Sequence, residues 1–339
     1  MLFTSHSTAT VTGGAASERG TAMNVAWLRH VLFAAGYTVM VLASITVAYS
    51  GTSIAIVWPS AGVAVWWAII CLGWRSFACM SAFVFAVPAL YLSVVDGQAL
   101  LPVFFVALSH VIAGPVVGLV LILLEKMFPP RSHFQGGDDR VSARIVLPRH
   151  VYRLLIVSLV MIPVAKAVGL VGLAMETAVS LELYMGLVLR DVAGVLAVAG
   201  PGIAISSAVG QKISGAAFRE FAGVTVVTAV LLALIFGPGQ DLPIAYLAML
   251  PLYWSATRLP VAVAAVHNVV TVVATMLLSY LVGTGPFAVS DDSVLDQASA
   301  TQIFIIMCVV LSLVVSTTVQ QHATLVAELA ALTEPDLRS

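Results

Sequence analysis

The sequence predicts an all-α protein: a polytopic membrane helical bundle of about ten transmembrane helices, with both termini in the cytoplasm. Only 9% of the 339 residues are charged, against roughly 25% in a typical soluble domain, and 60% are hydrophobic. Apolar runs long enough to cross a hydrocarbon core of about 30 Å recur along the chain. Basic residues gather in alternate segments between these runs, as expected for loops that stay on the cytoplasmic side.

This composition excludes two broad classes of protein. A soluble enzyme of this length needs a charged exterior, which a mean hydropathy of +1.06 does not allow. Nucleic-acid-binding proteins carry an excess of positive charge, whereas the net charge here is −1. Cys71, Cys79 and Cys308 lie in or beside apolar runs without metal-ligand spacing. We therefore expect them to be small buried apolar residues, and we expect no metal site and no cofactor.

The order of elements follows from where polar, Gly and Pro residues interrupt the apolar runs. Residues 1–23 are rich in Ser, Thr, Gly and Ala, which predicts a disordered cytoplasmic tail, and residues 24–320 form the integral membrane part. The run from Trp27 is too long for a signal peptide. The eighth run is short and contains Pro243 and Pro251, so we expect a kink or a break there. The ten runs lie near 27–49, 52–73, 76–95, 100–124, 151–175, 181–209, 217–236, 242–258, 260–283 and 301–320.

Charge placement tests this count independently. With a cytoplasmic N-terminus, 13 of the 15 Lys and Arg residues fall in inner segments and none in the outer loops, which carry acidic residues instead. A count wrong by one span would scramble this alternation, so the pattern supports ten spans. The longest inner loop, near 125–150, is either a solvated loop that sets orientation or a binding site for anionic lipid headgroups. The remaining two bases, Lys166 and Arg190, lie within spans.

Five polar or amphipathic side chains from four spans fall in one layer of the outer half of the membrane. Counting about 1.5 Å of rise per residue from the span ends places Trp58, His110, Lys166, Arg190 and Asp191 at similar depths. Ionisable groups are costly in hydrocarbon, so an intramembrane charge is a candidate functional residue with a partner to be identified. The layer has three interpretations: it holds the helices of the bundle together, forms an outward-opening ligand pocket, or forms part of an ion path.

Helix geometry suggests how these charges pair. Arg190 and Asp191 are adjacent, so they point about 100° apart around their helix and are poorly placed for each other. Lys166 and Asp191 then form the natural ion pair, which leaves Arg190 free for an anion or for Glu182 at the membrane boundary. His267, followed by Asn268, lies nearer the inner face, where interhelical hydrogen bonding accounts for both.

The segment from Trp58 to Gly62, with sequence WPSAG, is unusual inside a span. Pro59 removes a backbone donor, and Gly62 lets another helix approach closely. The segment predicts either a packing kink or a discontinuous helix whose carbonyl groups face a cavity rather than lipid.

Several stretches, in the same order, resemble the first MASE type of bacterial membrane-associated sensor domain over about residues 27–320. They are Trp58–Gly62 with an apolar run to Leu72–Arg75, Leu189–Gly194 continuing to Gly200–Pro201, Leu250–Arg258, and Gly283–Phe287 followed by Gln302–Phe304.

The resemblance implies a multi-pass sensory domain of the bacterial inner membrane. Such domains are usually joined to a cytoplasmic diguanylate cyclase, a phosphodiesterase or a histidine kinase, and some act beside a transporter-like partner. It implies a signal-transduction module for an external or membrane cue, with cyclic-di-GMP or two-component output. The chain contains no GGDEF or EAL motif and no kinase segment, so we expect no enzymatic activity. The expected pocket consists of Trp58, Pro59, His110, Lys166, Arg190 and Asp191.

The last segment, 321–339, is expected to be a cytoplasmic signalling-helix stub. Leu325, Leu329 and Leu332 have the spacing of a coiled-coil seam, and Pro335 is expected to end the helix. By analogy with the family, this helix would relay movement of span ten to a second copy of the chain, a cyclase or kinase, or a transporter-like partner. The alternative is an amphipathic end that lies on the inner leaflet.

Two other functions are consistent with parts of the pattern. A secondary transporter could also have ten spans, a broken helix such as that expected at Trp58 and Pro59, and a buried ion pair such as Lys166 with Asp191. However, no inverted repeat is visible in the sequence. An intramembrane enzyme is the poorest fit, because Ser109, His110 and the acidic residues form no recognisable nucleophile–base pairing.

Overall fold

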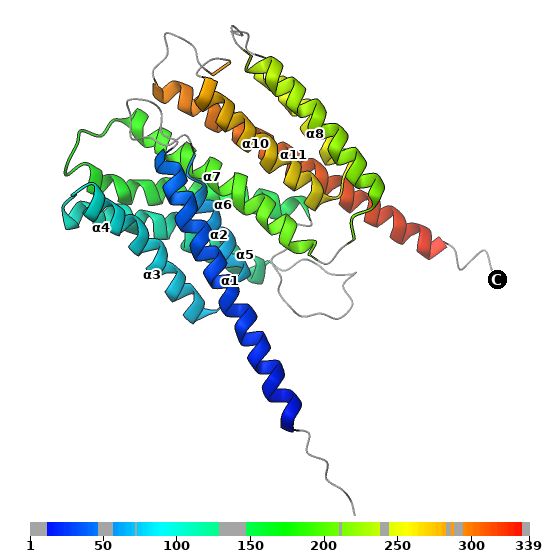
Figure 1. Ribbon diagram of the computed structural model, residues 1–339, viewed down its shortest axis with the longest axis horizontal. Helices are drawn as coiled ribbons and strands as arrows, with labels where there is room; N and C mark the ends of the chain where they lie inside the picture. The colour runs from blue at the N-terminus through cyan, green and yellow to red at the C-terminus, as the bar shows by residue number, and fades with distance from the viewer. Residues whose placement is uncertain are drawn as a thin grey trace, which may run out of the picture.

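A computed structural model describes residues 12–46, 57–71, 73–128, 147–209, 212–237, 244–282, 286–287 and 294–333. These residues form helices and no strand, arranged as an elongated bundle (Figure 1). Eight helical segments are long and apolar enough to cross a membrane, so the protein is a polytopic all-α membrane bundle. The elements are α1 (Thr12–Thr46), α2 (Pro59–Ile70), α3 (Trp74–Leu90), η1 (Tyr91–Val95), α4 (Leu100–Val111), η2 (Ile112–Val116), α5 (Val117–Met127), α6 (Pro148–Leu173), α7 (Leu181–Ser207), α8 (Gly215–Ile235), η3 (Ala245–Ala248), α9 (Met249–Arg258), α10 (Val261–Val282) and α11 (Val294–Thr333).

These elements follow the predicted spans in order. α3 with η1 forms the third span, and α4, η2 and α5 join into the fourth. η2 is one π-helical turn that contains Pro115, because a proline cannot donate the regular backbone hydrogen bond and the helix must widen around it. α1 begins and α11 ends at the same end of the bundle (Figure 1), as an even number of crossings requires.

α1 differs from the prediction at its start. The helix begins at Thr12, so residues 12–23 are helical and the expectation of a disordered tail over 1–23 is wrong for them. The physical reason is that the span that follows provides a helical nucleus from which the helix extends toward the N-terminus. Residues 1–11 lie outside the described part of the chain.

α2 differs from the predicted span of 52–73. It is a helix of 12 residues that begins at Pro59, and Trp58 before it has a non-helical backbone, with φ −113° and ψ 74°. Proline suits the first position of a helix, where its missing N–H would have no intrahelical partner. The helix therefore starts at Pro59, and whether it continues an earlier helical segment, as a kinked or a discontinuous helix would, stays a prediction. Residues 51–56 lie outside the described ranges.

The predicted eighth span corresponds to η3 and α9, which run back alongside α8. Ala245, at the start of η3, shares an apolar cluster with Phe236 after the end of α8. At the other end, the Arg258 guanidinium Nε lies 3.0 Å from the Glu220 carboxylate in the first turns of α8. A short 3-10 turn leads into an α-helix of 10 residues, with Pro251 at the third residue of α9. This segment is shorter than the eight long spans.

α7 forms the centre of the bundle and packs against α2, α6, α10 and α11. Small residues make this possible. A Cβ added at Gly200 would lie 2.7 Å from Leu313 of α11, and one at Gly202 would lie 2.5 Å from the Trp66 ring of α2. Close helix approach through small residues is the usual way that membrane helices associate. α7 therefore contacts both the short helix α2 and the last helix α11.

His267 joins three helices away from this centre. Its ring is fully buried, with Nε2 2.9 Å from the Thr228 hydroxyl of α8 and Nδ1 3.0 Å from the Ser255 hydroxyl of α9. The Asn268 amide donates to the Cys308 carbonyl of α11 over 3.2 Å. The prediction that both residues make interhelical hydrogen bonds is confirmed.

Replacing His267 with leucine is expected to lower the free energy of unfolding by about 1 kcal/mol, because two interhelical bonds worth about 0.6 kcal/mol each in a membrane are lost. The Thr228 and Ser255 hydroxyls keep their bonds to backbone carbonyls, so no donor is left unpaired. Thermal unfolding in detergent, followed by the monodisperse fraction after heating, measures the change. Failure of the variant to assemble would contradict this modest role.

Candidate functional site

Three charged side chains are buried together where α6 meets α7. Lys166 and Asp191 are 4% and 0% exposed and form an ion pair, as the depth argument predicts. Arg190 is also buried, and its Nε donates to Asp191 Oδ1 over 3.0 Å. The expectation that Arg190 is free of Asp191 is therefore wrong. Their Cβ atoms diverge around the helix, but the long arginine side chain folds back to reach the neighbouring carboxylate.

Two aromatic rings complete this arrangement. The Arg190 guanidinium carbon lies 4.7 Å from the centre of the Trp58 ring, a cation–π contact. The His110 ring stacks on Trp58, with centroids 5.3 Å apart and planes 26° from parallel. α4, α6, α7 and the segment before α2 thus each supply part of one group, which we call the charged cluster: Trp58, His110, Lys166, Arg190 and Asp191. Pro59 adjoins it as the first residue of α2.

Backbone contacts hold the start of α2 against α7. The Trp58 N–H donates to the Arg190 carbonyl over 3.3 Å. A Cβ at Gly194 would lie 2.2 Å from the Trp58 carbonyl oxygen, and one at Gly62 would lie 2.4 Å from the Gly194 carbonyl oxygen. Because such distances are shorter than any van der Waals contact, only glycine fits at both positions. The position of Trp58 over Arg190 therefore depends on these two glycines.

The charged cluster has an excess of positive charge and of hydrogen-bond donors. Lys166 and Arg190 both pair with Asp191, so two basic side chains face one carboxylate. Trp58 Nε1 and Ser60 Oγ, both buried, have no hydrogen-bond partner among the described residues. Ser60 lies in the first turn of α2, where the helix dipole adds positive potential. An anion with oxygen acceptors, or a halide, is the chemical complement of such a group.

α11 connects the centre of the bundle to one end of the chain. It is one helix of 40 residues that packs along α7 and α6 and then extends beyond the bundle (Figure 1). Two of the predicted relay residues, Leu325 and Leu329, are exposed. Leu332 lies within α11, but its side chain is outside the described part. The expected role of these residues in signalling stays a prediction.

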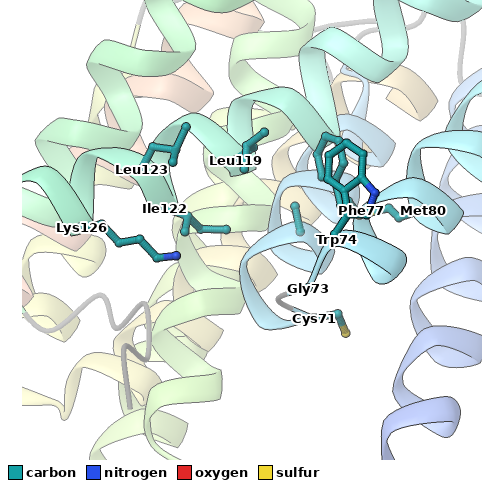
Figure 2. Close-up of a pocket in the computed structure, with 10 residues that line it drawn as sticks. Cys71, Gly73, Trp74, Phe77, Met80, Leu119, Ile122, Leu123 and Lys126 are labelled. Atoms are coloured by element: carbon teal, nitrogen blue, oxygen red, sulfur yellow. The ribbon is translucent and has the colours of Figure 1, made fainter. Parts of the chain in front are cut away.

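Sequence reasoning did not identify every notable feature. The pairing of Gly62 with Gly194 has a weak signal, because each is one of 25 glycines and helix rotation decides which of them meet. A cavity of about 220 Å³ lies between α2, α3 and α5 (Figure 2). It shares no residue with the charged cluster and was not predicted. Within the described ranges, no three His, Cys, Asp or Glu side chains are grouped so as to hold a metal ion.

Comparison with known proteins gives one match. A family model described as MASE1 matches residues 27–323, which covers α2 to α10 completely and most of α1 and α11. No curated protein and no solved structure matches the chain.

Proposed function

The chain belongs to the MASE1 family of membrane sensory domains, and we propose that it is a sensory module whose cue acts at the charged cluster and whose response leaves the membrane through α11. It is a multi-pass membrane protein, and its family is sensory rather than catalytic. We infer that the chain itself catalyses no reaction and passes its signal to a cytoplasmic diguanylate cyclase or histidine kinase, or to a transporter-like membrane partner.

The observation that carries this proposal is the position of α7. It bears Arg190 and Asp191 at the charged cluster, and six residues beyond Gly194 its Gly200 packs against Leu313 of α11. A change in how α2 or α6 sits on α7 therefore reaches α11 through direct packing contacts. Coupling between two sites needs such a physically connected element with two arrangements that both sites bias.

The chemistry of the charged cluster supports an anionic cue. A buried charge without a counter-charge is costly, and the cluster holds two cations to one carboxylate. Bound at the start of α2, an anion would balance the excess charge and accept hydrogen bonds from Trp58 Nε1 and Ser60 Oγ. It would shift the protein between two packings only to the extent that it binds one of them more tightly.

The output partner can be identified by purifying the protein in mild detergent from the membranes of the native host. Mass spectrometry then identifies the proteins that co-purify. A stoichiometric cyclase, kinase or transporter-like protein is the expected result. A solitary protein that catalyses solute flux would contradict the sensory role.

Anion dependence of thermal stability tests the cue. Replacing gluconate in the buffer with chloride, acetate or phosphate at constant ionic strength is expected to stabilise the protein. An anion present at about 100 times its Kd would add about 2.7 kcal/mol to the free energy of unfolding. His110→Glu adds a carboxylate beside the cations and is expected to remove this dependence, whereas His110→Gln removes the ring stacked on Trp58 without adding a charge and is expected to reduce the dependence less. Equal stability of wild type in all four salts would contradict a small anion of the chloride, acetate or phosphate type as the cue.

A secondary transporter is the alternative function, and one observation favours it. α2 begins inside the bundle beside a buried ion pair, and transporters place discontinuous helices with their N-termini toward anionic substrates. Uptake assays with purified protein in liposomes separate the two functions, because a sensor requires no flux across the membrane.

A further inference from the structure

The cavity between α2, α3 and α5 is separate from the charged cluster and has its own chemistry. Its walls are almost entirely apolar, and the residue that brings a charge is Lys126, in the last turn of α5 (Figure 2). Trp74, the first residue of α3, stands on the opposite side. The lining residues are Ala68, Cys71, Gly73, Trp74, Phe77, Met80, Leu119, Ile122, Leu123 and Lys126.

The cavity lies at the depth where hydrocarbon meets headgroups. α2 and α5 end and α3 begins beside it, at the side of the bundle that the charge pattern predicts to face the cytoplasm. Trp74 is 79% exposed, and an exposed tryptophan at a helix end is typical of the membrane interface. Lys126 is exposed and forms no ion pair with any described residue, so its ammonium group is available to an anion at this level.

The shape of the cavity depends on two tight features of its walls. Gly73 has a φ of +146°, a left-handed backbone that only glycine adopts easily, and it turns the chain from α2 into α3. On the other side, a Cβ at Gly118 would lie 2.5 Å from the Ala68 Cβ, so α2 and α5 are in close contact there. The cavity lies between this pair and α3.

The volume decides what kind of molecule fits. Sites that enclose a whole small-molecule ligand measure roughly 300–1,000 Å³, more than the 220 Å³ found here. A segment of an extended apolar chain needs less room and can continue out between the helices. We propose that this cavity holds part of an acyl chain of an anionic phospholipid from the inner leaflet, with the lipid phosphate bound to Lys126.

Native mass spectrometry of the full chain, released from micelles doped with phosphatidylglycerol or phosphatidylcholine, tests the proposal. Wild type is expected to retain phosphatidylglycerol in preference to phosphatidylcholine. Lys126→Gln is expected to weaken retention of phosphatidylglycerol about fivefold, the contribution of one lysine near an anionic headgroup, and to leave phosphatidylcholine unchanged. Leu123→Trp, which fills the cavity from its partly exposed edge, is expected to weaken retention of both lipids.

Lys212→Gln is the matched control. It removes the same charge from another exposed lysine, between α7 and α8 and away from the cavity, and is expected to bind both lipids as wild type does. Equal retention of the two lipids by wild type would overturn the proposal, as would an equal loss for Lys126→Gln and Lys212→Gln. If Leu123→Trp alone fails to assemble, the comparison of the two lysine variants still decides the outcome.

Discussion

Asp191→Asn is expected to lower the free energy of unfolding by about 3–5 kcal/mol, the usual cost of leaving a buried charge without its partner. The carboxylate of Asp191 pairs with both Lys166 and Arg190 and is completely buried. Its replacement by a neutral amide leaves two buried basic side chains without a carboxylate. Thermal unfolding in detergent, read from the monodisperse fraction after heating, measures the loss.

A second carboxylate-to-amide change provides the control. Glu125 pairs with Arg153 at the inner ends of α5 and α6, where the two side chains are 19% and 23% exposed. Ion pairs that water reaches contribute about 0–1 kcal/mol, so Glu125→Gln is expected to have little effect. Equal losses for the two variants would contradict the importance of burial.

Most of the fold could be predicted from the sequence because a membrane imposes two simple constraints. Apolar length and the position of basic residues are both visible in the sequence, and together they give the order of the spans and the common side of the termini. The start of α2 could not be predicted, because Pro59 inside an apolar run is compatible with a kink or with a helix start. The choice depends on what packs against it.

The charged cluster could be predicted in part for a similar reason. Depth along a helix follows from residue number, so the layer that joins Lys166 to Asp191 was predictable. The contact of Arg190 with Asp191 was not, because it depends on side-chain rotamers rather than on helix geometry. The position of Trp58 between Arg190 and His110 depends in turn on the contact of α2 with α7 at Gly62 and Gly194. The sequence does not indicate that these two glycines meet.

Gly194→Ala is expected to disturb the charged cluster from outside it, at a cost of about 1–3 kcal/mol or more for overpacking. The added Cβ would lie 2.2 Å from the Trp58 carbonyl oxygen, and backbone cannot move aside as a flexible side chain would. The start of α2 must therefore shift away from α7, which weakens the bond from Trp58 to Arg190. We expect lower thermal stability together with loss of anion-dependent stabilisation.

Gly62→Ala and Gly223→Ala complete the test. Gly62 faces Gly194 across the same contact, so one separation of α2 from α7 accommodates both methyl groups, and the double variant of Gly62 and Gly194 should lose less stability than the sum of the single losses. Gly223 of α8 has nothing within 4 Å of an added Cβ, and alanine there is expected to stabilise the helix by about 0.5–1 kcal/mol.

Strict additivity at Gly62 and Gly194, with anion dependence retained, would mean that α2 is not the element through which the charged cluster responds. A non-additive loss that also abolishes anion dependence would identify the α2–α7 contact as that element, because Gly194 itself carries no group that binds an anion.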